Sequence, residues 1–403
     1  MREAVRAWRF FGVISAASLL ILVASGWALS ANYVPSEADA FASILYLRKM
    51  GWLGVFLRSL HFYTSSVLIV AGFLFMLSLY LSGEYRQKRL LWHSGLTVYL
   101  LVLAVCFTGY LLPMDQNAYW GTVVRLGIVE STPVLGPTMA DLLRGGAVFN
   151  ASTLARFYSL HLSILPFLIA IVLFPVATRI VAGSAVWREK RVWALSMGFI
   201  LIMYVLASSV KAPLELPADL SDVDYVARPE WYFLWLFQFG KYVESMEWVR
   251  SLLLPLLGIG FLYLLPFLKK QAGGVRVTIA AAWCSVWLML TALAFLADKD
   301  LPDKLNYEAG MLIQAEEKFK EFCIDCHGAG GYGDGPQARA FDLDPPDFTA
   351  ATFWAEISGE RMSTSIREGG GKDMPSFRNK LTPHEIDALV DFLKASFQSQ
   401  ESR

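Results

Sequence analysis

Seven apolar stretches, each long enough to cross a lipid bilayer, constrain the fold of this chain more than any other feature. Crossing the hydrocarbon layer takes about 20 predominantly apolar residues. The stretches that meet this length are residues 10–30, 55–82, 94–113, 157–178, 193–210, 250–268 and 277–297. Because 55% of the residues are hydrophobic and only 17% are charged, a single water-soluble globule is excluded. The pattern predicts an all-α fold with a seven-helix transmembrane bundle.

The distribution of Lys and Arg predicts the direction of this bundle, since cytoplasmic loops of membrane proteins carry an excess of both. They gather before the first stretch and in every second loop, as Arg2, Arg6, Arg9, Arg86, Lys88, Arg89, Arg179, Arg188, Lys190, Arg191, Lys269, Lys270 and Arg276. An odd number of spans then puts everything after about Ala297 on the outer side. We expect a multi-pass protein of a bacterial inner membrane, in contact with lipid, whose C-terminal domain faces the periplasm. The 35 basic residues equal the 35 acidic residues, which argues against a nucleic-acid partner.

The composition changes around Leu301–Leu305, and the residues that follow have the balance of a soluble domain. The apolar residues that recur there at the spacing of one buried helix face are Ile386, Leu389, Val390 and Leu393. Thr382 precedes this run as an expected N-cap, with Glu385 three residues later. The pattern predicts a small helical domain over residues 301–403, tethered to the last membrane helix.

This C-terminal domain contains the motif Cys323-Ile324-Asp325-Cys326-His327. Its C-x-x-C-H pattern is typical of covalent haem c attachment. Cys323 and Cys326 lie about one helical turn apart and can reach the two vinyl groups, while His327 places an imidazole under the iron. The alternative is a chance pair of cysteines or a disulfide beside a histidine. Charge alone places the segment in the outer compartment that haem attachment requires, so we predict one covalent haem c.

The sixth ligand of this haem iron is predicted to be Met374, which follows a glycine-rich loop of the same domain. A thioether ligand opposite a histidine raises the reduction potential of a haem. A methionine is more often a packing residue, but Met362 lies in a stretch with helical character and Met311 lies upstream of the haem motif. Met374 is therefore the preferred candidate.

Two of the five histidines, His61 and His161, lie inside predicted membrane helices. Ionisable side chains at this depth are costly and usually functional. Both lie in the outer halves of antiparallel helices, which suits two axial imidazoles on one haem. The alternative is two unrelated histidines bonded to backbone carbonyl groups.

Glycines on the neighbouring helices favour the haem. Gly12 and Gly26 are fourteen residues apart on the first helix, and so are Gly95 and Gly109 on the third. Each pair shares one helix face, since fourteen residues make about four turns. Gly26 and Gly109 lie level with the two histidines, where a flat macrocycle could approach the backbone. Ordinary close packing of membrane helices is the alternative.

Five ordered motifs carry a resemblance to a known family: Arg58-Ser59-Leu60-His61, Gly109-Tyr110-Leu111-Leu112-Pro113, Leu142-Leu143-Arg144-Gly145, Arg156-Phe157-Tyr158-Ser159-Leu160-His161 and Pro229-Glu230-Trp231-Tyr232. Together they resemble cytochrome b of the Rieske/cytochrome b (bc-type) quinol-oxidising complexes. The closest pattern is the chloroplast-type form, with its four-helix part (1–192) and its three-helix part (193–300) on one chain. Residues 301–403 resemble a class I monohaem cytochrome c.

The resemblance implies roles for these residues. His61 and His161 would bind one haem b on the outer side, beside Gly26 and Gly109, and Arg58 would pair with a haem propionate. Pro229, Glu230, Trp231 and Tyr232 would border the outer quinol-oxidation pocket. In that pocket the Glu230 carboxylate would accept a quinol proton, which general-base chemistry also allows. Taken without the resemblance, Glu230 would be a solvated loop acid.

The sequence departs from the family at the second, inner-side b haem. Phe75 and Val176 stand where the family has the two histidine ligands. Gly12 and Gly95, which would face that haem, are retained. His93 is near the required depth but lies about 200° around the helix from Gly95, so it points away. We predict an empty inner site; an unexpected ligand holding a haem there is the alternative.

These features predict a quinol:cytochrome c oxidoreductase subunit with one haem b and one haem c, and without a complete Q cycle. Electrons would leave on the outer side through a Rieske iron–sulfur protein or another redox subunit, and through the fused haem c to a soluble or membrane cytochrome. The resemblance also implies a homodimer. Two alternatives are an electron-transfer conduit with a vestigial quinol site and a membrane anchor for a working cytochrome c.

Overall fold

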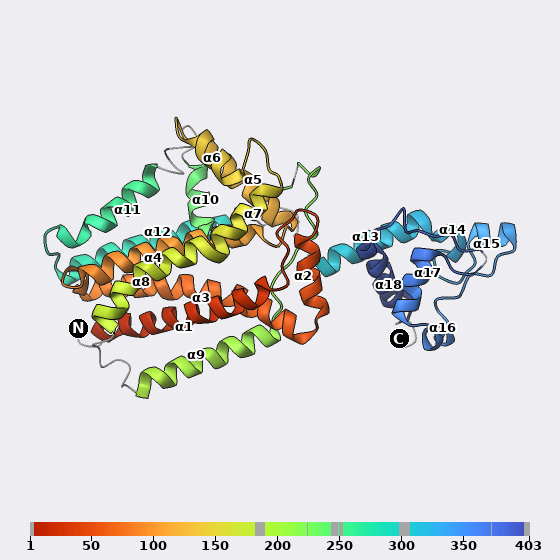
Figure 1. The fold of residues 1–403 in the computed structure, drawn as a ribbon, viewed down its shortest axis with the longest axis horizontal. Helices are drawn as coiled ribbons and strands as arrows, with labels where there is room; N and C mark the ends of the chain where they lie inside the picture. The colour runs from red at the N-terminus through yellow and green to blue at the C-terminus, as the bar shows by residue number, and fades with distance from the viewer. Residues whose placement is uncertain are drawn as a thin grey trace. The chain divides into compact units, whose positions relative to one another are not determined.

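The computed structural model describes residues 4–181, 190–223, 225–242, 249, 253–297, 307–371 and 373–398. Arg2, Arg188 and Leu301–Leu305 lie outside these ranges. Among the described residues every named element is a helix, and the predicted all-α class is confirmed. The chain divides into two compact units, the first of residues 1–213 and 217–302 and the second of residues 214–216 and 303–403 (Figure 1). The predicted division at residues 192 and 193 stays a prediction.

The first unit is built on long apolar helices. Five continuous helical stretches among the described residues are long and apolar enough to cross a membrane: Ala7–Ser30, Trp52–Ser82, Arg89–Leu111, Ala151–Arg179 and Gly273–Ala297. The other two predicted spans appear as shorter apolar helices, Ala194–Ser209 and Leu254–Phe267. Part of the predicted 250–268 span lies outside the described residues. The fourth span begins at Ala151, earlier than predicted, because Asn150 and Thr153 form a capping box there.

The first unit combines the long apolar helices with shorter helical segments. They are α1 (Ala4–Ser30), α2 (Ala40–Lys49), α3 (Trp52–Ser82), η1 (Glu84–Arg86), α4 (Arg89–Leu111), α5 (Gln116–Glu130), α6 (Gly136–Arg144), α7 (Ala151–Ser159), η2 (Leu160–Ile164), α8 (Leu165–Val176), η3 (Ala177–Val181), α9 (Lys190–Ser209), η5 (Trp231–Phe233), α10 (Leu234–Lys241), α11 (Leu254–Leu264), η7 (Leu265–Phe267) and α12 (Gly273–Ala297). Helix α1 packs along α3, α4 packs along α8, and α3 contacts α4, so these four helices form one bundle.

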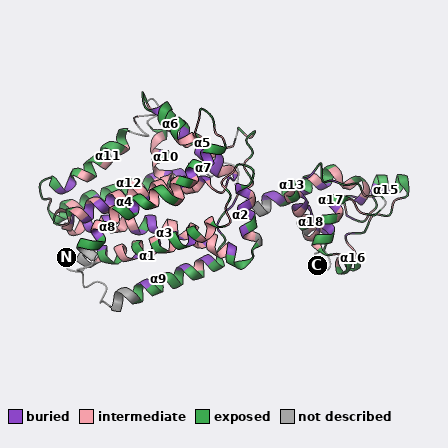
Figure 2. Ribbon diagram, viewed as in Figure 1, coloured by how far each residue is buried: buried purple, intermediate pink, exposed green. Residues whose placement is uncertain are grey.

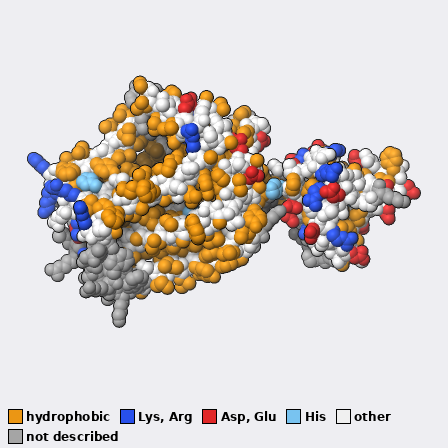
Figure 3. All heavy atoms as spheres, viewed as in Figure 1, with side chains coloured by type: hydrophobic (Ala, Val, Ile, Leu, Met, Phe, Trp, Pro, Cys, Tyr) orange, Lys and Arg blue, Asp and Glu red, His pale blue; other side chains and the backbone are white. Residues whose placement is uncertain are grey.

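The surface of this bundle is that of a membrane protein. Large apolar side chains such as Leu20, Trp27, Phe167 and Phe174 are exposed on its flanks, and Figure 3 shows hydrophobic atoms covering that face. Helices α9 and α11 are exposed along most of their length (Figure 2). Because lipid, unlike water, imposes no penalty on such surface, these faces fit a bilayer.

Two of the predicted cytoplasmic loops meet at one end of the bundle. The Arg276 guanidinium donates from Nε to the Leu81 carbonyl oxygen at 3.3 Å. Arg86 donates from Nη1 to the Leu268 carbonyl oxygen. The loop that follows α3 and the loop that follows α11 therefore lie at the same end, as the alternation of Lys and Arg predicts.

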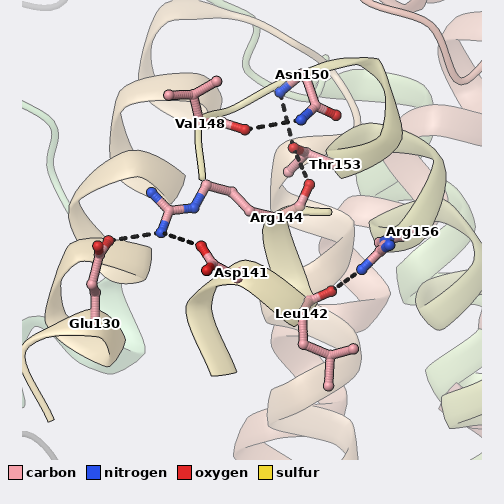
Figure 4. A network of polar contacts seen from close by, with 8 residues as sticks. All are labelled: Glu130, Asp141, Leu142, Arg144, Val148, Asn150, Thr153 and Arg156. Carbon is pink, nitrogen blue, oxygen red and sulfur yellow. Dashed lines mark hydrogen bonds and ion pairs between the residues drawn. The ribbon is translucent and has the colours of Figure 1, made fainter. Parts of the chain in front are cut away.

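At the opposite end, the short helices α5, α6 and α7 are joined by a polar network (Figure 4). Arg144 forms ion pairs with Glu130 at 2.7 Å and Asp141 at 3.5 Å. The Arg144 carbonyl oxygen accepts a hydrogen bond from the Thr153 hydroxyl at 2.5 Å. Gly145, at φ 86°, ends α6 in the left-handed region. These contacts fix α5 relative to the start of the helix that carries His161.

The second unit is a small helical domain with its own apolar core. Its helices are α13 (Tyr307–Phe322), α14 (Ile324–His327), α15 (Pro336–Phe341), α16 (Ala351–Glu356), α17 (Gly359–Glu368) and α18 (Pro383–Phe397). The predicted N-cap is confirmed, since Thr382 and Glu385 form a capping box at the start of α18. The predicted buried face is also confirmed, with Ile386, Leu389, Val390 and Leu393 all at most 5% exposed.

Candidate redox sites

The imidazole rings of His61 and His161 face each other inside the four-helix bundle. Their centroids are 6.0 Å apart, although α3 and η2 carry them from opposite chain directions. Two imidazoles that bind one metal ion from opposite sides have centroids roughly 6 Å apart, because each metal–nitrogen bond is about 2 Å long. The spacing therefore fits one iron between the two rings.

Hydrogen bonds set the tautomer of both rings. His161 Nδ1 lies 2.9 Å from the Val105 carbonyl oxygen, which can only accept, so Nδ1 carries the proton. His61 Nδ1 lies 3.0 Å from the Ser25 hydroxyl oxygen. That hydroxyl donates to the Ile21 carbonyl oxygen at 2.7 Å, so it accepts from His61. Each ring thus keeps a lone pair on Nε2, as a haem ligand requires.

The backbone makes room at both histidines. A Cβ atom added at Gly26 would lie 3.0 Å from His61 Cε1, and one added at Gly109 would lie 2.7 Å from His161 Nδ1. A side chain at Gly109 would require the His161 ring to move, and one at Gly26 would crowd the His61 ring. His161 itself lies in η2, a π-helical turn of residues Leu160–Ile164. Such turns widen a helix locally and are frequent at functional sites.

Arg58, which is expected to pair with a haem propionate, forms hydrogen bonds with the backbone of its own chain. Its guanidinium donates to the carbonyl oxygens of Ala212 at 2.8 Å and Pro213 at 2.5 Å. These two bonds use two of its five N–H donors. The remaining donors leave the expected pairing with a haem propionate possible, and that pairing stays a prediction.

The corresponding region at the inner end of the bundle is filled by apolar side chains. A Cβ atom added at Gly12 would lie 3.4 Å from the Phe75 ring, and one added at Gly95 would lie 2.9 Å from it. The Phe75 ring therefore lies against both retained glycines. Val176 is 7% exposed and belongs to the same apolar cluster that Phe75 packs against.

His93 is turned toward a different part of the unit. Its Nε2 atom lies 3.0 Å from the Tyr263 carbonyl oxygen. Its ring stacks on the rings of Tyr263 and Phe267, at centroid distances of 5.8 and 5.7 Å. These contacts hold the imidazole against the α11–η7 segment, in line with the prediction that it points away from Gly95.

The segment Pro229–Tyr232 folds against the bundle. Trp231 and Tyr232 pack on an apolar cluster that also receives Val105 and Cys106 of α4. The Trp231 indole donates to the Ser66 hydroxyl at 3.5 Å. Burial raises the pKa of the Tyr232 phenol, and the nearby Cys106 and Glu230 raise it further. Glu230, the candidate proton acceptor, is half-buried and lies close enough for its charge to act on Tyr110, Tyr232 and Cys106.

The second unit brings together the ligands predicted for haem c. His327 is only 8% exposed, and its ring stacks on Phe348 with centroids 4.6 Å apart. Burial lowers the pKa of His327, opposed by the backbone of Pro346, so the imidazole is neutral and able to bind a metal. Cys323 and Cys326 are free thiols, and burial raises the pKa of Cys323 to about 12.

Met374 contacts the same apolar core as Cys323. Its sulfur would lie 3.3 Å from a Cβ atom added at Gly370, so the glycine-rich loop leaves room for the thioether. Met362 and Met311, the alternatives, are both at most 6% exposed and belong to the core itself. The donor set of two thiols, one neutral imidazole and one thioether therefore fits a covalently held haem.

Among the described residues, no group of three or more His, Cys, Asp and Glu side chains could hold a bare metal ion. A haem does not need one, since its porphyrin supplies four nitrogen ligands and the protein adds only one or two axial ligands. Sequence reasoning singled out the candidate axial residues but missed Ser25, whose bond to His61 crosses between helices. It also missed Arg125 of α5, which lies beside Tyr110.

Comparisons with known proteins agree with this geometry. The family model for cytochrome b/b6/petB matches residues 1–177. The model for cytochrome c oxidase, cbb3-type, subunit III matches residues 311–393. The first match contains both membrane histidines, and the second contains the C-x-x-C-H motif and Met374.

Individual relatives extend the match. The cytochrome bc complex cytochrome b subunit of Chlorobaculum thiosulfatiphilum is 32% identical over 300 residues, 67% of this chain and 68% of that protein. Cytochrome b6 of Gracilaria tenuistipitata var. liui is 40% identical over 164 residues, 40% of this chain and 75% of that protein. A solved chain of a hyperthermophilic respiratory Complex III shares the fold, with a TM-score of 0.57 and 21% identity over 73% of this chain and 90% of that one.

Proposed function

This chain belongs to the cytochrome b subunits of cytochrome bc complexes, and from that premise we propose that it oxidises quinol on the outer side of the membrane. It acts as the cytochrome b subunit of a quinol–cytochrome c oxidoreductase, in a complex with other redox subunits. Its C-terminal domain is a fused cytochrome c. The finer parts of the proposal are the quinol pocket at Pro229–Tyr232 and a single haem b.

One observation carries the quinol pocket. Trp231 and Tyr232 pack on the same apolar cluster as Val105, whose carbonyl oxygen binds His161. A quinol held against Pro229–Tyr232 would therefore be close to α4, the helix whose backbone orients the His161 ring. Glu230 would take the proton from the quinol hydroxyl. A carboxylate at the edge of an apolar pocket is suited to this, because it can turn from the substrate to water.

His61 and His161 would hold the haem b, and His327 and Met374 would hold the haem c attached to Cys323 and Cys326. When bound, these haems supply one-electron redox centres. The chain's own residues fix the ligand tautomers, through Ser25 and the Val105 carbonyl.

The single haem b is supported by the packing of the inner half of the bundle. Phe75 lies against Gly12 and Gly95, and Val176 belongs to the same cluster. A flat macrocycle needs the space that this ring fills. With the inner site closed, both quinol electrons leave on the outer side, and no complete Q cycle operates.

The partners follow from this route. One-electron acceptors on the outer side are required, for which a Rieske iron–sulfur protein and a soluble or membrane cytochrome are the proposed candidates. We also propose a bacterial inner membrane location, with the cytochrome c domain in the periplasm, and a homodimer.

Quinol-dependent reduction of the haems tests this function. With the purified complex and a short-chain quinol, Glu230→Gln should slow haem reduction by at least tenfold while the haem content is unchanged. Glu316→Gln, which removes an exposed carboxylate paired with Lys320 in the second unit, is the control and should keep the wild-type rate. Equal rates for wild type and Glu230→Gln would favour the alternatives, a conduit or an anchor with a vestigial quinol site.

A further inference from the structure

Arg125 is a partly buried cation on α5, and its charge acts on Tyr232 of the segment proposed to bind quinol. Its guanidinium carbon lies 4.0 Å from the centroid of the Tyr110 ring and 5.8 Å from that of Phe107. Both aromatic residues belong to α4, one turn or so beyond the Val105 carbonyl that binds His161. Arg125 therefore lies against the C-terminal end of α4.

One nitrogen of this guanidinium has no hydrogen-bond partner among the described residues. This atom, Arg125 Nη1, is shielded from solvent. Stacking on an aromatic ring stabilises a cation but does not satisfy its N–H groups. A buried, unsatisfied donor of a charged group is among the more costly features a fold retains. Such a group calls for an explanation, and an acceptor that arrives from outside the chain is one.

The surroundings indicate what that acceptor is. The charges of Arg125 and Glu230 both act on Tyr110 and on Tyr232, so all four groups share one neighbourhood. The Tyr110 hydroxyl is directed to backbone, with the Asn117 carbonyl oxygen at 3.0 Å and the Arg228 carbonyl oxygen at 3.3 Å. The phenol also has a side-chain hydrogen bond with the Arg125 guanidinium. The Arg125 Nη1 atom itself has no partner among the described residues. The site offers one cation, one carboxylate and aromatic walls.

We propose that Arg125 is a substrate-binding residue of the quinol pocket, whose Nη1 donates a hydrogen bond to the quinol oxygen that gives its proton to Glu230. This proposal rests on the proposed function and names a binding residue for the same site. The preferred ligand is accordingly a quinol with a free hydroxyl group, bound more tightly as its anion than as its neutral form.

The step is a proton transfer in which charge is conserved. The O–H bond of the quinol breaks, its proton forms a new O–H bond on the Glu230 carboxylate, and the negative charge moves to the quinol oxygen. Arginine keeps its positive charge in proteins, so the guanidinium gives up no proton in this step. Its fixed positive charge stabilises the quinol anion and lowers the pKa at which the bound quinol ionises.

Three substitutions separate charge from hydrogen bonding. Arg125→Leu removes both, Arg125→Gln keeps a donor without the charge, and Arg125→Lys keeps the charge without the planar fork. The purified complex is assayed for kcat as a function of pH. Loss of the charge should shift the part of this profile in which kcat rises with pH by roughly one to two pH units toward higher pH. We expect this shift in the Leu and Gln variants and not in the Lys variant.

Binding gives a second measurement that does not depend on turnover. The dissociation constant of an oxidised short-chain quinone, followed by equilibrium titration of the complex, should rise about tenfold or more in Arg125→Leu. It should rise less in Arg125→Gln. Arg367→Gln, which removes an exposed arginine paired with Glu368 in the second unit, should leave both measurements at their wild-type values.

The outcomes are distinguishable. If the wild type oxidises quinol and Glu230→Gln abolishes this, but Arg125→Leu keeps the wild-type pH profile and quinone affinity at normal haem content, the assignment of Arg125 is wrong and the proposed function stands. If the wild-type complex oxidises no quinol, both fail. If Arg125→Leu does not assemble, Arg125→Gln against Arg125→Lys decides, because equal pH profiles in those two variants contradict a role for the charge.

Discussion

His161 Nδ1 lies 2.9 Å from the Val105 carbonyl oxygen, and this single contact decides which ring nitrogen is left for a metal. A carbonyl oxygen can only accept, so the proton is on Nδ1 and the lone pair is on Nε2. The equivalent contact of His61 uses a side chain, the Ser25 hydroxyl at 3.0 Å. Only the His61 contact can be removed by a substitution that leaves the backbone intact.

Ser25→Ala should weaken haem b binding because the His61 ring loses one of the groups that orient it, the Ser25 hydroxyl, while its bond to the Leu22 backbone remains. Loss of such a partner of a metal-binding histidine typically costs about 10- to 100-fold in metal affinity. The measurement is the b-to-c haem ratio of the purified protein after competition with an apo-haem-binding protein. Ser15→Ala is the control, since the Ser15 hydroxyl donates to the Phe11 carbonyl oxygen of its own helix at 2.8 Å. Equal haem retention in the two variants would contradict the role assigned to Ser25.

Gly109→Ala should prevent haem b incorporation. The added Cβ atom would lie 2.7 Å from His161 Nδ1, and the ring is unable to retreat without breaking its bond to Val105. Gly127→Ala is the matched control, because nothing lies within 4 Å of the Cβ atom added there. The measurement for both variants is the absorbance of the haem b band in the reduced protein. A b band of wild-type size in Gly109→Ala would contradict the haem b assignment.

The wild-type protein should contain one haem b for each haem c, measured as pyridine haemochromes. The double substitution Phe75→His and Val176→His should raise this ratio toward two, because it restores two imidazoles and removes the ring that lies against Gly12 and Gly95. Phe75→His alone should not raise it, since one imidazole leaves the opposite side apolar. A ratio of two in the wild type would overturn the single-haem proposal.

Met374→Leu should lower the midpoint potential of haem c. The two side chains have similar volume, so packing against the core is kept, but the thioether that stabilises the reduced iron is lost. Met362→Leu, at a core position that is 4% exposed, is the control and should leave the potential unchanged. A redox titration of the haem c band in the full-length protein makes the comparison. If the midpoint potential falls in the Met362 variant and not in the Met374 variant, the ligand is misassigned.

Much of the fold follows from local sequence patterns. The apolar stretches predict where the membrane helices run, because the bilayer imposes one length on all of them. The cap at Thr382 and the buried face of α18 are also local features, and both are confirmed. Helices α5 and α6 were not predicted, because they are short and their stability comes from contacts such as the ion pairs of Arg144.

The candidate sites divide in the same way. His61, His161 and the cysteine motif are rare residue types in special positions, so the sequence alone singles them out. Ser25 and Arg125 do not stand out in the amino-acid sequence. Ser25 reaches His61 across 36 residues of chain, and Arg125 becomes unusual only when its Nη1 atom is found shielded and without a partner in the described part of the fold. The π-helical turn at Leu160–Ile164 likewise has no sequence signature.

The Phe75 ring against Gly12 and Gly95 has a consequence for energy conservation. Under the proposed route no electron travels toward the cytoplasmic face, so the inner half of the bundle acts as an insulator and turnover is not electrogenic. Protons set free by quinol oxidation would still acidify the outer compartment. The complex would thus add to the pH difference across the membrane without building voltage of its own, and a membrane-potential dye on proteoliposomes would stay silent while an external pH electrode responds.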